Sequence, residues 1–168
     1  RNVELRQRLS DLLENARRND NLFSKTKRLV VTLINANNWI DIEAALDDSL
    51  RQDFNVDHWS LLYFTDKQLE HPLRSISNKD KQREIHRLFK GRRAFCGQLS
   101  DETMDLLLNE EHSDAESIAA AQIRNGQQTG VICVASNDPK FYRNNMDTLF
   151  LDYIADVLGL ILPNLPQS

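Results

Sequence analysis

The fold is decided by residues 117–136, which have the sequence SIAAAQIRNGQQTGVICVAS. Two runs of small, apolar and β-branched residues, 117–124 and 129–136, stand on either side of Asn125-Gly126. Asn-Gly between such runs is a strong signal for a tight β-hairpin, because both residues tolerate the positive φ angles of the turn. These residues therefore predict two neighbouring antiparallel strands.

Helical and strand patterns alternate over the rest of the chain. Val56–Phe64 is rich in β-branched and aromatic residues and predicts a strand, and 93–98 predicts a short one. Residues 65–81 predict a loop with one short strand at most. This order predicts an α+β layer, in which helices lie on one side of an antiparallel sheet and the first and last helices lie together. Apolar residues at helical spacing mark four helices, at 42–54, 81–90, after Ser100 and 146–162.

Residues 1–35 predict one long coiled-coil-type helix, which no Pro or Gly interrupts. Its apolar residues form a narrow seam along one side. On a lone helix such a seam stays in water, whereas a partner helix buries it. From Leu22 onward the apolar face widens, so we expect the later turns to lie on the helix's own domain. The seam has alternating spacings of four and three residues: Leu5, Leu9, Leu12, Ala16, Asn19, Phe23, Thr26, Val30 and Leu33.

We predict homodimerisation through the first part of this helix, where the polar Asn19 on the seam fixes the register. The alternative is that the whole helix folds back onto its own domain. The chain then divides into a dimerisation helix (1–35), a domain (36–163) and a short tail (164–168). The predicted dimer contacts are Leu5, Leu9, Leu12, Ala16, Asn19 and Phe23.

The composition is that of an ordinary folded protein. The chain has 168 residues, 40% hydrophobic and 27% charged, with a net charge of −4, which excludes collagen-like and highly charged disordered chains. The densest apolar run, Val157–Leu162, is far shorter than the roughly 20 residues that span a bilayer, so no membrane segment is predicted. Two cysteines are too few for a disulfide framework, which favours the reducing cytoplasm. Because the chain begins at Arg1, we expect the natural protein to carry residues before it.

Basic side chains gather in two segments of this acidic chain. Residues 1–28 carry a net charge of +4 and residues 79–93 a net charge of +5. Such patches attract phosphates or acidic partners, but they are also the ordinary solvated faces of helices. The acidity of the whole chain and the lack of a recognition motif argue against nucleic-acid binding.

Several segments resemble a bacterial family named domain of unknown function four-eight-four. They are RRAFCGQLSDE (92–102), SIAAAQI (117–123) with GVICVASNDPKFY (130–142), and NMDTLFLDYIADVL (145–158). The order of helix, strand, hairpin and last long helix also looks like a GAF domain, a sensory relative of PAS domains. The resemblance implies a central antiparallel sheet with flanking helices and a small-molecule ligand, but it names neither ligand nor cofactor.

We expect a pocket between the sheet and residues 79–101. Arg93 suits an anionic group, and the small side chains of Ala119 and Ala121 leave room for a ligand or for a close-packed helix. The predicted lining residues are Ser60, Leu62, Arg93, Cys96, Ala119 and Ala121.

The chain carries little catalytic or metal-binding chemistry. The four histidines show no metal-ligand spacing, and there is no nucleophile motif and no phosphate loop. The resemblance to GAF domains, together with the long helix that leads into the domain, implies a non-enzymatic sensory or interaction module. One alternative is a thiol redox enzyme or sensor that uses Cys96, with Cys133 as a conceivable resolving partner, since positive charge such as that of Arg92 lowers the pKa of a thiol. Another is a structural scaffold with a filled core and no ligand.

Overall fold

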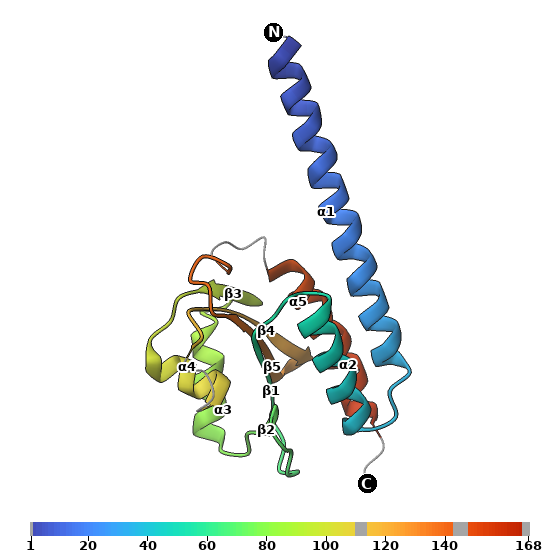
Figure 1. Cartoon of the computed structure of the whole chain (residues 1–168). Coiled ribbons are helices and arrows are strands. Elements are labelled where there is room, and N and C mark those ends of the chain that lie inside the picture. Colours follow the sequence, from blue (N-terminus) through green and yellow to red (C-terminus); the bar gives the residue numbers. More distant parts are fainter. Residues whose placement is uncertain (1, 110–113, 143–147, 166–168) are drawn as a thin grey trace.

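The computed structural model describes residues 2–109, 114–142 and 148–165 (Figure 1). A long helix, α1 (Asn2–Ile34), leads into a domain built on one five-stranded sheet. The elements that follow are α2 (Trp39–Gln52), β1 (His58–Tyr63), β2 (Leu73–Ser75), α3 (Lys79–Leu88), β3 (Ala94–Gly97), α4 (Asp101–Leu108), β4 (Ser117–Asn125), β5 (Gln127–Ser136), α5 (Leu149–Ile161) and a short 3₁₀ helix, η3 (Leu162–Asn164).

The predicted hairpin lies at the centre of the sheet. The strand order is β2-β1-β5-β4-β3, and β4 pairs antiparallel with β5 across Gly126. Gly126 has a φ of +80°, which glycine adopts without the steric cost that a side chain would bring. The hairpin and the α+β fold class are therefore confirmed.

One strand pair differs from the antiparallel sheet that we expected. β2 runs parallel to β1, with Leu73 opposite Leu61, while the pairs β1–β5, β5–β4 and β4–β3 are antiparallel. The reason lies in the connection over residues 64–72, which carries the chain back alongside β1 before β2 begins. A tight turn would have forced an antiparallel pair.

Helices cover both faces of the sheet, so the expectation of helices on one side is wrong. α1, α2 and α5 pack on one face and α3 and α4 on the other, as Figure 1 shows. The cause is visible in β5, which is apolar on both sides. Ile132 and Val134 belong to the cluster under α1, α2 and α5, and Val131 and Cys133 belong to the cluster under α3 and α4. We call these two sides the α1/α2/α5 face and the α3/α4 face.

Three helices begin at a capping side chain, whose oxygen accepts a hydrogen bond from a main-chain N–H group in the first turn of the helix. Asn38 Oδ1 accepts a hydrogen bond from the Asp41 N–H at 2.8 Å at the start of α2. Asn78 does the same for Lys81 in α3, at 3.0 Å, and Ser100 for Thr103 in α4, at 3.3 Å. Such caps replace bonds that the first turn of a helix cannot make internally, so they set where these helices begin.

α1 has two parts with different surroundings. In its C-terminal part Thr26, Leu29 and Leu33 are buried on the α1/α2/α5 face, and the helix lies beside α5 as predicted. Its N-terminal part extends away from the domain (Figure 1). The later turns therefore lie on the domain and the earlier turns do not.

Candidate functional site

The six predicted pocket residues do not line one cavity. Leu62 lies on the α3/α4 face, whereas Ala119 and Ala121 are buried on the α1/α2/α5 face. Because side chains alternate along a strand, it is Ala120 that faces α3 and α4. The expectation that Leu62, Ala119 and Ala121 share a pocket is wrong, and the two alanines instead serve the close packing of helices on β4.

Ser60 and Arg74 connect α4 to the sheet by hydrogen bonds. The Ser60 hydroxyl donates a hydrogen bond to the Leu107 carbonyl at 2.6 Å, and Arg74 Nη2 donates one to the Leu106 carbonyl at 2.7 Å. The last carbonyls of a helix have no partner within the helix, so these two donors satisfy the end of α4. The hydroxyl proton of Ser60 is therefore already used in a hydrogen bond within the fold. Its predicted role as a ligand-binding residue has no support in this geometry.

Sequence reasoning missed Arg74, because its stretch resembled a polar loop. Burial lowers the pKa of the Arg74 guanidinium. Its Nη1 atom is buried and has no hydrogen-bond partner in the described part of the chain. The only signal in the sequence was one charged residue next to the apolar Leu73, which is buried in the sheet.

Arg93 faces α5 and not the predicted pocket. Its Nη1 lies 3.9 Å from Asp156 Oδ2, and both side chains are more than half exposed. Nearby on α5, burial and the negative charge of Asp156 raise the pKa of Asp152, while Arg93 opposes that rise. The arginine that we assigned to an anionic ligand is therefore part of a surface charge cluster with two carboxylates.

A groove of about 490 Å³ does lie in the predicted region, between α3, β3 and α4. Cys96 borders it, alone among the six predicted residues, but packs against the cluster on the α1/α2/α5 face. Phe89 and Phe95 also line it, with their ring centroids 4.8 Å apart, and Arg87, Lys90 and Arg92 add positive charge beside Glu84.

The two cysteines cannot act as a redox pair in this fold. Cys96 on β3 pairs with Ala119, and Cys133 on β5 pairs with Ala120, so β4 separates them. Two strand spacings amount to about 10 Å, and a disulfide needs Cα atoms closer than about 7 Å. Burial also raises the pKa of the Cys133 thiol to about 12, although hydrogen bonding to Ser60 and the charge of Arg74 oppose the rise. Cys133 is a buried apolar side chain and not a resolving thiol.

An apolar stripe runs along the side of α1 that its own domain leaves uncovered. Successive helical residues are about 100° apart around the axis, which places Leu5, Leu9 and Phe23 on one side of α1. Ile34, at the end of the helix, points to the same side. These four side chains are 58–70% exposed. Ala16 and Asn19, also predicted at the dimer contact, are exposed on the same helix. Leu12 is part of α1, but its side chain lies outside the described residues.

A second apolar stripe lies on α5, next to the first. Leu149, Tyr153 and Leu160 are spaced by four and seven residues and are 55–68% exposed. Between α1 and α5 lies an apolar groove of about 520 Å³, which Phe23, Leu149 and Tyr153 line. Exposed apolar side chains on two adjacent helices form a larger patch than the scattered residues of an ordinary surface.

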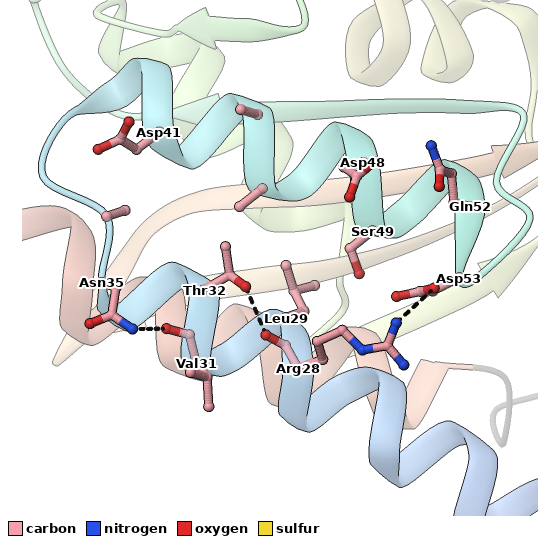
Figure 2. Close-up of a pocket in the computed structure, with 13 residues that line it drawn as sticks. Arg28, Leu29, Val31, Thr32, Asn35, Asp41, Asp48, Ser49, Gln52 and Asp53 are labelled. Atoms are coloured by element: carbon pink, nitrogen blue, oxygen red, sulfur yellow. Dashed lines mark hydrogen bonds and ion pairs between the residues drawn. The ribbon is translucent and has the colours of Figure 1, made fainter.

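The other side of α1 forms a cleft of about 730 Å³ with α2 (Figure 2). Its polar lining includes Arg28 and Asn35 from α1 and its C-terminal end, and Asp48 and Ser49 from α2. Arg28 lies 3.5 Å from Asp53 at the end of α2. Sequence reasoning missed this cleft, because its residues come from two helices whose relative placement no local pattern specifies.

The described residues contain no cluster of three or more His, Cys, Asp or Glu side chains that is placed to hold a metal ion. Among the described helices, none is long and apolar enough to cross a membrane.

Comparisons of the fold point to GAF domains. The structure is similar to the GAF domain of A. aeolicus nlh2 in an inactive state, with a TM-score of 0.56 and 13% identity over 85% of this chain and 96% of that one. It is also similar to the GAF domain of a candidate sensor histidine kinase from Pseudomonas syringae pv. tomato, with a TM-score of 0.55 and 14% identity over 89% and 94% of the two chains. At these identities the likeness establishes the fold. No curated protein matches the sequence.

The sequence itself matches a family description over nearly its whole length. The match is to "Protein of unknown function, DUF484" and covers residues 1–167. That span includes α1 as well as the sheet and its helices, so the long N-terminal helix is part of what the family shares. The chain therefore belongs to the DUF484 family, with a domain of GAF-like fold.

Proposed function

We propose that this chain is a non-enzymatic sensory or interaction module of the cytoplasm, which dimerises through α1 and whose domain binds a small molecule. The observation that carries the proposal is the exposed stripe of Leu5, Leu9 and Phe23 on α1. These side chains would stay in water in a monomer, and a second copy of α1 would bury them.

A second copy of this chain fits the patch better than an unrelated partner. A two-fold dimer places the same surface of both chains in contact, so each stripe meets its own equivalent. The stripe on α1 continues into the groove beside Leu149 and Tyr153 of α5. A partner α1 would therefore lie against apolar side chains along both the free and the docked part of the helix.

The proposed link between ligand and output follows from the continuity of α1. The same helix is buried in the domain at Leu29 and Leu33 and exposed at Leu5 and Leu9. A ligand that favours one of two placements of the buried part would shift the packing of the exposed part by its difference in affinity for the two states. The DUF484 family match over residues 1–167 supports the unity of helix and domain.

Native mass spectrometry before and after mild denaturation tests both halves of this proposal. We expect a dimer with a defined extra mass that denaturation releases. A monomer at roughly 50 µM would contradict dimerisation, since a dimer with a Kd of about 1 µM would be mostly assembled at that concentration. An empty dimer would favour the scaffold alternative, which predicts a filled core.

The second candidate function is thiol chemistry at Cys96. The supporting observation is that Cys96 is only partly buried and borders a groove that Arg87 and Arg92 also line, although it packs against the cluster on the α1/α2/α5 face. It would have to work without Cys133, which lies on the far side of β4. Selective alkylation of Cys96 within seconds near neutral pH would favour this function, and a rate like that of a free thiol would dispose of it.

A further inference from the structure

We propose that the cleft between α1 and α2 is a binding site for a small organic cation, an alkylammonium or guanidinium compound with a short apolar body. The proposal rests on the ligand-binding half of the function above and deepens it by naming the site and the class of ligand, and it holds whether or not α1 pairs with a second copy. The site lies on the α1/α2/α5 face, away from the groove at Cys96.

Charge in the cleft favours a cation. Three carboxylates line it, those of Asp41, Asp48 and Asp53, against the single guanidinium of Arg28. Arg28 is engaged with Asp53 at 3.5 Å, and Asp41 accepts a hydrogen bond from the Asn37 N–H at 2.9 Å. Asp48 has no ion-pair partner within the described residues. A bound cation would supply it with one.

A buried hydroxyl without a partner points to a ligand independently of the charges. Ser49 is 8% exposed, and its Oγ has no hydrogen-bond partner among the described residues. Figure 2 shows this hydroxyl pointing from α2 toward α1, into the cleft. A buried polar group without a partner is costly, so native proteins rarely keep one unless something else satisfies it. An N–H donor in the cleft would do so.

The neutral side chains of the cleft also present acceptors. Thr32 Oγ1 donates its proton to the Arg28 carbonyl at 2.9 Å, and Asn35 Nδ2 donates to the Val31 carbonyl at 2.9 Å. Each side chain thereby uses a donor in a hydrogen bond to the main chain of α1. The lone pairs of Thr32 Oγ1 and of the Asn35 side-chain oxygen, Oδ1, stay available as acceptors. The cleft is therefore lined mainly by acceptors, which matches the several N–H donors of an ammonium or guanidinium group.

The apolar part of the lining sets the size of the ligand's body. Leu29, Ala36, Ala44 and Ala45 also line the cleft, and Leu29 and Ala45 are buried. Three of these four side chains are single methyl groups, which leave room over them for a few methylene groups. A short carbon chain with a cationic end fits both parts of the lining.

A titration with 1,4-diaminobutane, followed by amide NMR shifts and melting temperature, tests the site. The uncharged 1,4-butanediol has the same chain length and serves as the control ligand, both at roughly 0.1 M salt. We expect saturable binding with a Kd below about 1 mM, shifts confined to residues 28–53, and a raised melting temperature. We expect the diol to show no saturable binding and to change neither the amide shifts nor the melting temperature.

Three variants separate this site from general attraction to an acidic protein. Asp48→Asn should weaken binding about tenfold, because one charge-assisted bond is lost. Ser49→Ala should raise the melting temperature of the free protein and still weaken binding, a combination that a merely structural serine would not produce. Asp66→Asn, at an exposed aspartate that does not line the cleft, should change neither the melting temperature nor the binding.

The site would be disproved by unsaturable binding, by equal effects of the diamine and the diol, or by equal weakening in Asp48→Asn and Asp66→Asn. None of these outcomes bears on dimerisation, which the oligomeric state of the same samples reports. Failure of the site and failure of the proposed function are therefore distinguishable.

Discussion

Gly159 of α5 lies so close to Arg124 of β4 that a methyl group on Gly159 would come within 2.0 Å of the Arg124 carbonyl oxygen. The Gly159 carbonyl also accepts a hydrogen bond from Asn125 Nδ2 at 3.0 Å. No other residue type leaves room for this approach. This contact sets how α5 lies on the sheet, and α5 in turn supports α1.

Replacement of Gly159 by alanine should therefore separate α5 from β4. We expect Gly159→Ala to lower the free energy of unfolding by about 3 kcal/mol or more, since backbone atoms cannot yield as a flexible side chain does. Urea denaturation followed by circular dichroism measures the change. Leu160→Ala, at a neighbour that is 68% exposed, is the control and should cost much less. Similar losses in both variants would contradict the close approach.

The hydrogen bond from Ser60 to the Leu107 carbonyl should contribute measurably to stability. Ser60→Ala leaves that carbonyl at the end of α4 without a donor, so we expect a loss of about 1–2 kcal/mol in chemical denaturation. The control is Ser77→Ala, at an exposed serine in the loop before α3. A stability equal to that of the unchanged protein would show that water replaces the serine at no cost.

Stability should depend on pH through Asp47. Hydrogen bonds from Trp59, at 2.8 Å, and Arg51, at 2.7 Å, lower the pKa of Asp47. A carboxyl whose pKa is lower in the folded state stabilises the fold above its unfolded pKa of about 4, and that contribution is lost as the pH falls through the folded pKa. Because the Arg51–Asp47 pair is half exposed, the contribution is discounted to less than about 1 kcal/mol.

We accordingly expect Asp47→Asn to be less stable than the unchanged protein at neutral pH and to approach it in stability near pH 3. Urea midpoints at the two pH values measure this. Asp66→Asn should show no such pH-dependent gap. A gap for Asp47→Asn that stays constant down to acid pH would indicate lost packing and not lost charge.

Cys133 should resist alkylation until the protein unfolds. It is fully buried, and its thiol has a pKa of about 12, so almost no thiolate exists at neutral pH. With Cys96→Ser as background, iodoacetamide labelling followed by mass spectrometry should give no product in buffer and complete labelling in urea. Rapid labelling of the native protein would mean that β5 is not enclosed as described.

The sequence predicted the parts of the fold that depend on local patterns. Asn125-Gly126 marked the hairpin, Ser100 marked the start of α4, and the resemblance of residues 92–158 pointed to the family that the comparisons then showed. Each of these signals lies within a few residues or in one continuous segment.

Which face a side chain occupies could not be predicted in the same way. A strand that is apolar on both sides, such as β4, has no alternation to show which residues meet which helices. The prediction for Ala119 and Ala121 is therefore wrong about the side of the sheet, and no local pattern indicates a role for Arg74, because its partner, the Leu106 carbonyl, is remote in sequence. The α1–α2 cleft arises only when two helices meet.

Sedimentation equilibrium of Leu9→Glu beside Ser10→Glu tests whether α1 associates with a second copy of itself. Both variants add one negative charge to the same turn of α1. Leu9 lies on the exposed apolar stripe, whereas the exposed Ser10 lies on another side of the helix, so only Leu9→Glu places the charge on the stripe. We predict twice the chain mass for the unchanged protein and for Ser10→Glu at roughly 50 µM, and the mass of one chain for Leu9→Glu. A single-chain mass for the unchanged protein, or a dimer that survives Leu9→Glu, would contradict the account.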